Sequence, residues 1–340
     1  MSVRVAINGF GRVGRCAFRS ALESESTIEW VGINDLAGPT TLAHLLRHDT
    51  VYGPFPGWVE VDGSTLVVDG VSIPVFCEGD PADLPWHALG VDVVLECTGH
   101  FRSRADAAKH LEAGARKVII SAPGKGVDAT IVHGVNDDTY DAELHDVISN
   151  ASCTTNCLAP VAKVLHEAFG IKHGTMTTVH AFTGDQRLVD LPHKDLRRAR
   201  AASANIVPTS TGAAKAIGLV IPELEGKLHG LAARVPVLTG SLVDLTVELA
   251  VPTTVDEINA VFAEHCDKGP LAGILQFSDE PLVSSDVIKS TYSAVFDSGL
   301  TAVSGGTQVK VVAWYDNEWG YSTRLVELAE RVLAPVALTA

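Results

Sequence analysis

The sequence predicts an α/β protein: a doubly wound, mostly parallel sheet, followed by an α+β domain with a mostly antiparallel sheet. Three observations favour this. A buried strand runs into a glycine-rich turn at the N-terminus. Apolar runs then alternate with helical patterns up to about residue 150, the arrangement typical of parallel sheets. Beyond that point strand patterns dominate, and 340 residues are enough for two cores.

The first strand, Val3 to Asn8, leads directly into a G-x-G-x-x-G motif. The motif reads Gly9-Phe10-Gly11-Arg12-Val13-Gly14. A helical pattern follows to about Leu22. Glycines at this spacing allow a tight turn and let the backbone approach a pyrophosphate at the helix N-terminus. In this context the motif indicates a dinucleotide site.

A second strand, Ile28 to Ile33, ends at Asn34 and Asp35. Asp35 lies about twenty residues beyond the glycine turn, where an acid can accept hydrogen bonds from an adenosine ribose. Its carboxylate would repel the 2′-phosphate of NADP, which favours NAD as the cofactor. The alternative is a purely structural turn followed by a helix-capping aspartate.

The next stretch is predicted from short patterns. Residues Leu66 to Ile73 form a hairpin pattern with Asp-Gly at its turn. Further elements are expected at Val91 to Cys97 (strand), Ser103 to Ala113 (helix), Lys117 to Ser121 (strand), Thr130 to Val132 and Val147 to Ile148 (strands). Thr98 follows one of these strands and Ser121 ends another, so both lie at the carboxyl ends of strands, where a doubly wound sheet binds its ligand.

Cys153 is the candidate nucleophile. It lies in Ser149-Asn150-Ala151-Ser152-Cys153-Thr154-Thr155-Asn156-Cys157-Leu158-Ala159-Pro160, where a strand pattern gives way to a helical one. Backbone N–H groups and the helix dipole at such a position lower a thiol pKa. The alternative is a buried structural cysteine. Cys157, four residues on, is expected to pack on the inner side of the helix.

Candidate partners of the thiol follow in the C-terminal half. The strand pattern Thr175 to Thr183 contains His180, a candidate base, although one of 13 histidines is more often structural. The polar segment Asp185 to Ala202 carries a basic cluster that could bind phosphate, make ion pairs at a subunit interface or lie in solvent. Thr211 and Gly212 open a helix that would suit a phosphate.

The rest of the C-terminal half alternates strands and helices. Strands are expected at Leu228 to Val235, Leu242 to Ala250 and Val309 to Tyr315, with helices at Thr254 to Ala263 and from about Thr323 to Leu333. Arg234 lies within the first of these strands. An arginine in such an apolar context is typical of a site with an anionic partner.

Composition excludes several classes of protein. The net charge of −15 argues against nonspecific nucleic-acid binding. No apolar run has the length of a membrane span, and no leader sequence is visible, so the cytoplasm is expected. Six cysteines without a framework argue against disulfides. Cys153 and Cys157 lack a second matching pair of ligands for zinc, so no metal is expected.

Together these segments resemble the phosphorylating, NAD-dependent glyceraldehyde-3-phosphate dehydrogenases over nearly the whole chain. The matching segments are Ile7 to Arg12, Ser149 to Pro160, His193 to Arg200, Thr211 to Lys215 and Trp314 to Ser322. The resemblance implies an NAD-binding Rossmann domain (residues 1–152), a catalytic domain (153–318) and a C-terminal helix (319–340) that returns to the first domain. It also implies a homotetramer.

The resemblance also implies roles for individual residues. Cys153 would be the nucleophile and His180 its base. NAD would contact Gly9, Phe10, Gly11, Arg12, Val13, Asp35, Thr98, Ser121 and Asn317. The substrate's C3 phosphate would lie near Thr183 and Arg234, and attacking inorganic phosphate near Ser152, Thr154, Arg198, Thr211 and Gly212. A thioester on Cys153 would carry the oxidised acyl group.

Some positions depart from the family pattern. Gly79 stands where arginine is usual, and Cys97 where serine is usual; Phe182, Gly184 and Val237 also differ. None removes a catalytic group. Erythrose-4-phosphate dehydrogenase and an NADP-preferring relative are the enzyme alternatives, and a binding protein with a silent site is the alternative from another class.

Overall fold

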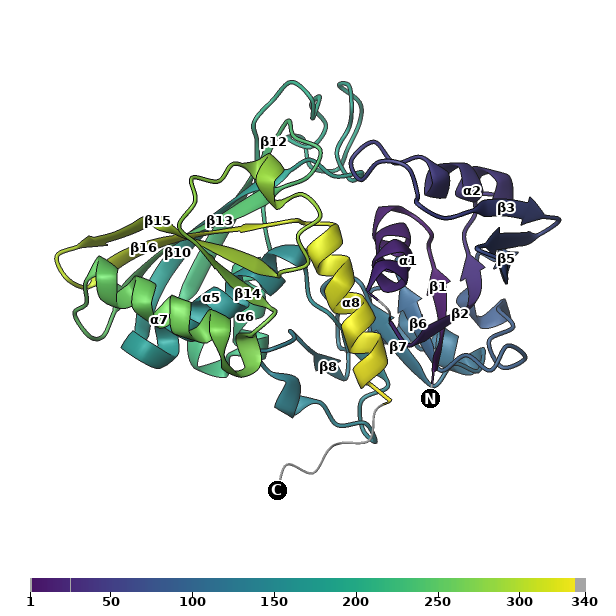
Figure 1. Ribbon diagram of the computed structural model, residues 1–340, viewed down its shortest axis with the longest axis horizontal. Helices are drawn as coiled ribbons and strands as arrows, with labels where there is room; N and C mark the ends of the chain where they lie inside the picture. Colours follow the sequence, from purple (N-terminus) through teal and green to yellow (C-terminus); the bar gives the residue numbers. More distant parts are fainter. Residues whose placement is uncertain (1, 25, 334–340) are drawn as a thin grey trace. The chain divides into compact units, whose positions relative to one another are not determined.

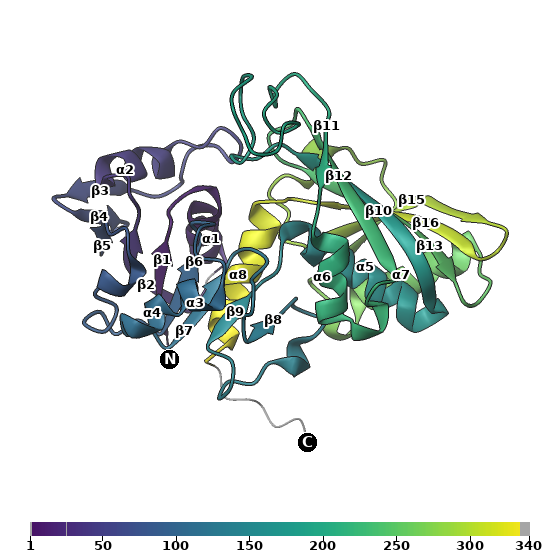
Figure 2. The ribbon, with the colours of Figure 1, turned by 180° about the vertical axis from the view of Figure 1, so that it is seen from behind.

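The structure is a computed structural model that describes residues 2–24 and 26–333, and it divides into two compact units (Figures 1 and 2). Unit 1 comprises Met1–Ile131, Asp138–Ala151 and Ser322–Ala340; unit 2 comprises Val132–Asp137 and Ser152–Tyr321. Residues 1, 25 and 334–340 of the expected domain ranges lie outside the described residues. The division between the units falls close to the candidate nucleophile and within the last helix.

Unit 1 is built on one sheet whose order, among the described residues, is β3-β4-β5-β2-β1-β6-β7-β9-β8. The strands are β1 (Val3–Asn8), β2 (Ile28–Asn34), β3 (Val59–Asp62), β4 (Thr65–Val68), β5 (Val71–Phe76), β6 (Val93–Glu96), β7 (Lys117–Ile120), β8 (Ala129–Thr130) and β9 (Val147–Ser149). All pairs are parallel except β3–β4 and β4–β5. The predicted doubly wound, mostly parallel sheet is therefore confirmed.

The helices of unit 1 follow the strands as the alternation predicts. They are α1 (Arg12–Glu23), α2 (Pro39–Arg47), α3 (Arg104–Ala107) and α4 (Lys109–Glu112), and most of α8 (Trp319–Arg331). The single helix expected at Ser103 to Ala113 is wrong, because the chain forms two short helices there. The N–H of Leu111 donates to the carbonyl of Ala108, an i→i+3 bond that interrupts the α-helical pattern.

Two aromatic clusters form much of the core of unit 1. Phe18 lies 5.6 Å from Phe10 and 5.4 Å from Trp30, between ring centroids. Trp86, which has no exposed surface, packs with Ala6, Val31 and Val94. Burial of these large rings fixes the glycine turn and the strand ends on a rigid base.

Unit 2 has a second sheet, with the order β11-β12-β10-β13-β16-β15-β14 in the described residues. The strands are β10 (Ile171–Ala181), β11 (Val207–Ser210), β12 (Leu228–Val235), β13 (Ser241–Leu249), β14 (Leu275–Ser278), β15 (Ala294–Ser304) and β16 (Gln308–Tyr315). Only β10–β12 and β14–β15 are parallel. The predicted, mostly antiparallel sheet is confirmed, whereas β14 and β15 were not predicted.

Three helices cover one face of this sheet: α5 (Cys153–Phe169), α6 (Ala213–Val220) and α7 (Val255–Asp267). Both views show them on the same side (Figures 1 and 2). Along β13, residues such as Val243 and Leu245 on the helix side are buried, while Leu242 and Asp244 on the other side are only half-buried. The face opposite the helices is therefore partly open to solvent in the single chain.

Candidate active site

Cys153 is the first residue of α5, as the sequence predicts. Ser152 is the N-cap: its hydroxyl accepts a hydrogen bond from the N–H of Thr155 at 3.1 Å. The helix continues for 17 residues with Pro160 inside it. Cys153 therefore lies at the positive end of a long helix dipole, beside backbone N–H groups that have no partner within the helix.

His180 lies beside this thiol. The Nε2 atom of His180, on β10, is 3.4 Å from the Cys153 Sγ atom, and the imidazole is buried. Its Nδ1 atom is 2.7 Å from the carbonyl oxygen of Ala181. If Nδ1 carries the hydrogen and donates it to that oxygen, Nε2 is left as the acceptor for the thiol proton. The structure thus places the predicted nucleophile and the predicted base side by side, a proximity that the sequence alone could not show.

Arg234 approaches the same imidazole from β12. His180 and Arg234 are partners in the parallel register of β10 and β12. The guanidinium NH1 donates to the Ala181 carbonyl at 3.0 Å and lies 2.7 Å from His180 Nδ1. The buried Nε atom of Arg234 has no hydrogen-bond partner among the described residues. A half-buried guanidinium whose buried Nε atom has no such partner, beside the base of a nucleophile, is a candidate anion-binding group.

Burial controls the ionisation of this pair in the chain without ligands. Burial raises the pKa of the Cys153 thiol, although Arg234 and nearby N–H groups act in the opposite direction. Burial and the Arg234 charge lower the pKa of His180 to about 3. Both shifts favour a neutral thiol and a neutral imidazole. The expectation of a lowered thiol pKa is therefore corrected: burial outweighs Arg234 and the nearby N–H groups.

The side chain of Thr154 points into the core. Its hydroxyl lies 2.9 Å from the hydroxyl of Tyr315, which lies 2.9 Å from that of Thr178. Because this hydroxyl is already engaged, an anion would meet Thr154 through its backbone N–H. Cys157 is also fully buried, with Sγ 3.8 Å from the Ala313 carbonyl, and burial raises its thiol pKa. The predicted inward packing of Cys157 is confirmed.

A second cationic group is held by the irregular segment that follows β10. Arg198 pairs with Asp185, and its Nε atom donates to the Thr209 hydroxyl at 3.0 Å. Asp195 lies 3.5 Å from the same Nε atom and accepts from Thr209 at 2.9 Å. The guanidinium is thus fixed by two carboxylates at the end of β11.

The other predicted anion contacts lie at element ends of unit 2. Thr183 comes two residues after the end of β10, and its carbonyl accepts from the N–H of Gln186 at 2.9 Å. Gly212 is the N-cap of α6, and the Thr211 hydroxyl accepts from the N–H of Ala213 at 3.2 Å. The first N–H groups of α6 therefore begin beside Thr211 and Gly212, as the sequence predicts.

Unit 1 carries a separate cavity of about 410 Å³ at the carboxyl ends of its strands. Four predicted cofactor residues line it: Gly9, Gly11, Asp35 and Thr98. Two of the other lining residues, Gly79 and Cys97, are positions where the sequence departs from the family pattern. The remaining ones, which the sequence analysis did not assign, are Asn8, Asn34, Leu36, Glu78, His100 and Phe101. Most follow directly on strand ends, which is the signal that could have identified them.

The glycine turn has the geometry that a pyrophosphate site needs. Gly9 has φ +92°, and a Cβ atom there would lie 2.7 Å from the backbone nitrogen of Thr98. A Cβ on Gly14 would lie 2.3 Å from the Gly9 carbonyl oxygen, whereas Gly11 has open space around it. These residues fit a dinucleotide whose phosphates rest on the turn before α1.

Asp35 does not cap a helix, which removes the alternative considered for it. Its carboxylate accepts from the N–H of Phe10 at 2.8 Å and from the N–H of Ala37 at 2.9 Å. The N-cap of α2 is Gly38, without a side-chain bond. Asp35 therefore ties the glycine turn to the end of β2 and keeps its charge at the cavity.

Five predicted cofactor residues are not among those that line the cavity. Phe10 is buried, and its N–H is the one that donates to Asp35. Arg12 pairs with Asp49, and Val13 is half-buried within the first turn of α1. The N–H of Ser121 donates to the Glu96 carbonyl at 3.0 Å. In unit 2, the Asn317 side-chain oxygen accepts from the Ser241 hydroxyl at 2.8 Å. Within residues 2–24 and 26–333, no group of three or more His, Cys, Asp or Glu side chains could hold a metal ion.

Two family models match the chain. "Glyceraldehyde 3-phosphate dehydrogenase, NAD binding domain" matches residues 3–104, and "Glyceraldehyde 3-phosphate dehydrogenase, C-terminal domain" matches residues 152–317. The chain belongs to the glyceraldehyde-3-phosphate dehydrogenase family. The expected family and its NAD-binding fold are thereby confirmed, and the cavity in unit 1 lies in the NAD-binding part of the chain.

Full-length relatives lead to the same family. The glyceraldehyde-3-phosphate dehydrogenase of Geobacillus stearothermophilus is 60% identical over 329 residues, which are 97% of this chain and 98% of the relative. That of Streptomyces coelicolor is 58% identical over 328 residues, 96% of this chain and 98% of the relative. Glyceraldehyde-3-phosphate dehydrogenase 1 of Bacillus subtilis is 59% identical over 329 residues, again 97% and 98%. No helix in the described part of the chain is long and apolar enough to cross a membrane.

Proposed function

We propose that this family member converts D-glyceraldehyde 3-phosphate, NAD and inorganic phosphate into 1,3-bisphosphoglycerate and NADH. The observation that carries the proposal is the 3.4 Å separation of Cys153 Sγ and His180 Nε2 at the start of α5. A thiol with an adjacent base forms a covalent adduct with an aldehyde. NAD, when bound, supplies the hydride acceptor.

The first step is addition of the Cys153 sulfur to the aldehyde carbon. His180 Nε2 accepts the thiol proton as the S–C bond forms, so a neutral pair can still react. The protonated imidazole then donates to the oxygen of the adduct, which stabilises the developing charge. Loss of the adduct's C–H hydrogen as hydride and of its O–H proton to His180 leaves a thioester on Cys153.

Phosphate binding would use the two guanidinium groups of unit 2. Arg234, with its unpartnered Nε atom, would bind the C3 phosphate together with Thr183. Arg198, Ser152, the N–H of Thr154 and the first turn of α6 at Thr211 and Gly212 would bind inorganic phosphate. Attack of that phosphate on the thioester carbon releases the acyl phosphate and returns the sulfur as a thiolate, which is then protonated.

The cofactor would contact the chain at the glycine turn. Gly9, Phe10, Gly11, Arg12 and Val13 would bind the pyrophosphate, and Asp35 the ribose. Thr98 and Ser121 would line the same edge. The Asn317 side-chain oxygen already accepts a bond from Ser241, so its amide nitrogen would be offered to the nicotinamide carboxamide.

We further propose a cytoplasmic homotetramer. The support in the structure is the face of the unit 2 sheet opposite the helices, where alternate residues of β13 remain half-buried in the single chain. A sheet face that is partly open in the single chain can pack against the same face of a second copy. Light scattering on the purified chain tests the tetramer, and a monomeric mass at micromolar concentration would contradict it.

The function itself is tested by NADH absorbance. It should rise when the chain is mixed with D-glyceraldehyde 3-phosphate, NAD and phosphate, and it should not rise with Cys153→Ser. His180→Asn should lower the rate by at least about 10²-fold. Higher kcat/KM for erythrose 4-phosphate would instead favour the erythrose-4-phosphate dehydrogenase alternative. Full activity of Cys153→Ser would refute the mechanism.

A further inference from the structure

A chain of buried polar side chains crosses the carboxyl ends of neighbouring strands in unit 1. β6, β1 and β2 end in Glu96, Asn8 and Asn34, all buried. Asn8 Nδ2 donates to Glu96 Oε2 at 2.6 Å, and Asn34 Nδ2 donates to Asn8 Oδ1 at 2.7 Å. Asn34 also exchanges two 2.9 Å hydrogen bonds with the backbone of Glu78. Three of these residues, Asn8, Asn34 and Glu78, line the cofactor cavity.

Glu96 is the centre of this chain. Its Oε1 atom accepts from the N–H of Thr98 at 2.8 Å and from the Thr98 hydroxyl. Its Oε2 atom accepts from Asn8 and lies 3.1 Å from His110 Nε2. A carboxylate in which each oxygen meets two donors is fully satisfied without water.

The tautomer of His110 is set by its other neighbour. Trp86 Nε1 lies 3.0 Å from His110 Nδ1, and both side chains are fully buried. Because an indole nitrogen can only donate, Nδ1 must be the acceptor. The imidazole hydrogen therefore lies on Nε2 and is directed to Glu96. Asn8 Nδ2 lies 3.3 Å from the same Nε2 atom, and in this tautomer both nitrogens direct a hydrogen to Glu96 Oε2.

Glu96 holds the loop that follows β6. The Thr98 hydroxyl donates to Glu96 and accepts from the N–H of His100 at 3.0 Å, so its orientation is fixed. Gly99 has φ +71°, which allows the tight reversal between them. The loop packs closely against the glycine turn, because a Cβ atom on Gly9 would lie 2.7 Å from the Thr98 backbone nitrogen. The N–H and the hydroxyl of Thr98 thus both make their hydrogen bonds within the protein.

We propose that Glu96 is a positioning residue for cofactor binding. It holds the Thr98–His100 loop directly and the Gly9 turn through Asn8, so that the two rims of the cavity keep the spacing that a dinucleotide needs. The inference rests on the proposed function, because the ligand that benefits is NAD. Glutamine at position 96 would keep the shape but would set an amide N–H against the donors that Glu96 now accepts from.

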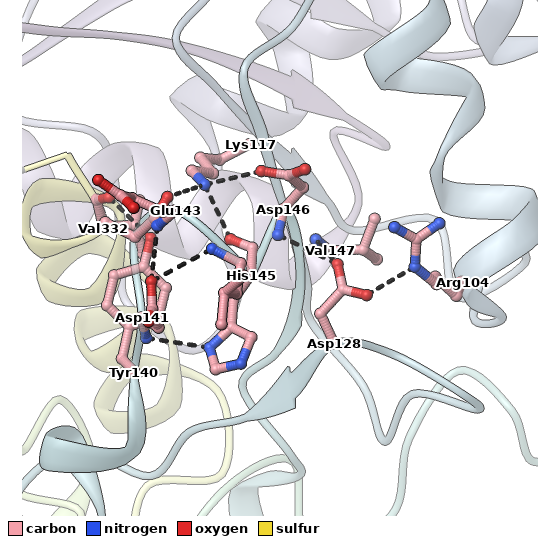
Figure 3. A network of polar contacts seen from close by, with 12 residues as sticks. Arg104, Lys117, Asp128, Tyr140, Asp141, Glu143, His145, Asp146, Val147 and Val332 are labelled. Atoms are coloured by element: carbon pink, nitrogen blue, oxygen red, sulfur yellow. Dashed lines mark hydrogen bonds and ion pairs between the residues drawn. The ribbon is translucent and has the colours of Figure 1, made fainter.

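Lys117 offers a matched control in the same sheet (Figure 3). It is the first residue of β7 and therefore lies at the amino end of the parallel strands. Lys117 is buried, and its Nζ atom donates to the carbonyls of Ala142 (2.6 Å) and His145 (2.9 Å) and to Asp146 Oδ1 (2.7 Å). Lys117→Met thus removes a buried charge that makes three hydrogen bonds, at the end of the sheet away from the cavity.

The test compares Glu96→Gln, Thr98→Val and Lys117→Met in the full chain. The NAD dissociation constant is measured by calorimetry, KM for NAD and kcat at saturating NAD by NADH absorbance, and the unfolding temperature without NAD by scanning fluorimetry. Glu96→Gln should raise the dissociation constant and KM for NAD at least about tenfold and leave kcat within about twofold. Thr98→Val, which removes only a hydroxyl, should raise both by a smaller factor and combine less than additively with Glu96→Gln.

Lys117→Met should lower the unfolding temperature but leave the NAD dissociation constant within about twofold of the unsubstituted chain. The inference is overturned if both cavity variants bind NAD as tightly as the unsubstituted chain, or if Lys117→Met weakens NAD as much as they do. Thr98→Val keeps the test decisive if Glu96→Gln does not fold. Failure of the unsubstituted chain to bind NAD would instead overturn the proposed function, and this inference with it.

Discussion

His180 and Arg234 are register partners on β10 and β12, and the Arg234 guanidinium lies 2.7 Å from the Nδ1 atom of the imidazole. Two contacts of Nδ1 compete. Donation from Arg234 would place the imidazole hydrogen on Nε2, whereas donation to Ala181 places it on Nδ1. Only the second arrangement leaves Nε2 free to accept the proton of Cys153. An anion that attracts the guanidinium would therefore favour the tautomer in which His180 acts as a base.

The first prediction concerns the charge of Arg234. Arg234 lowers the pKa of Cys153, because a nearby cation stabilises the thiolate, and it lowers the pKa of His180 by opposing the imidazolium. In Arg234→Gln both pKa values should rise. The rate of Cys153 alkylation by iodoacetamide should then reach its midpoint at a higher pH than in the unsubstituted chain.

Peptide mass spectrometry separates alkylation of Cys153 from that of the exposed Cys77. Arg200→Gln is the control, because Arg200 is exposed and pairs with Asp190. Its alkylation profile should match that of the unsubstituted chain. A midpoint that stays in place, or moves to lower pH, in Arg234→Gln would show that the guanidinium does not stabilise the thiolate.

The second prediction concerns the choice between NAD and NADP. Asp35 lies at the cavity with its carboxylate bonded to two backbone N–H groups. Its charge should give a large preference for NAD in kcat/KM. Asp35→Asn keeps the size of the side chain and removes the charge, so the preference should fall by about tenfold. Comparable rates with both cofactors in the unsubstituted chain, at equal subsaturating concentrations, would contradict this role.

Motifs that are local in sequence were predicted well. The glycine turn, the start of α5 and the hairpin at Asp69 and Gly70 each depend on residues that are neighbours in the chain. Asp69 (φ 49°) and Gly70 (φ 84°) both adopt the left-handed conformation that an Asp-Gly turn requires. Local backbone preferences therefore determined these features before any tertiary contact was known.

Long-range arrangements were not predictable in the same way. Cys153 and His180 are brought together by the packing of α5 on a sheet in which β10 lies between β12 and β13. No single pattern specifies that strand order. β15 was missed because its register shifts between Asp297 and Ala302, which breaks the two-residue alternation. The hydrogen bond from the Thr98 hydroxyl to Glu96 depends on the conformations of both side chains, which the sequence does not specify.

A third prediction concerns the start of α8. The helix begins at Trp319, the first residue of the C-terminal helix that the resemblance implies and four residues before the start that the sequence pattern indicates, at about Thr323. Asp316 explains the difference: its Oδ1 atom accepts from the N–H groups of Glu318 and Trp319, both at 2.9 Å. Its Oδ2 atom accepts from the N–H of Lys289 at 2.7 Å. Asp316→Ala would remove the acceptor of these three N–H groups, of which that of Trp319 is buried, and should cost about 1–3 kcal/mol.

Thermal unfolding measures this loss, and Asp286→Ala is a suitable control because Asp286 caps an exposed turn, with its Oδ2 atom bonded to the N–H of Val283. The control should lower the unfolding temperature by a smaller amount, since water can replace the lost acceptor. Equal shifts for the two variants would show that Asp316 does not determine where α8 begins.

The last prediction compares two glycines at the same cavity. Gly9 has φ +92°, and an added Cβ would lie 2.7 Å from the Thr98 nitrogen and 2.8 Å from the Cys97 carbonyl carbon. Gly79 lines the same cavity but has open space around it. Gly9→Ala should destabilise the chain by about 2 kcal/mol or more and weaken NAD binding, because the backbone of both loops must shift. Gly79→Ala should change stability by less than about 0.5 kcal/mol. Calorimetry of NAD binding and urea unfolding test both variants. If Gly9→Ala is as stable as Gly79→Ala and binds NAD as tightly, the two loops are not in close contact.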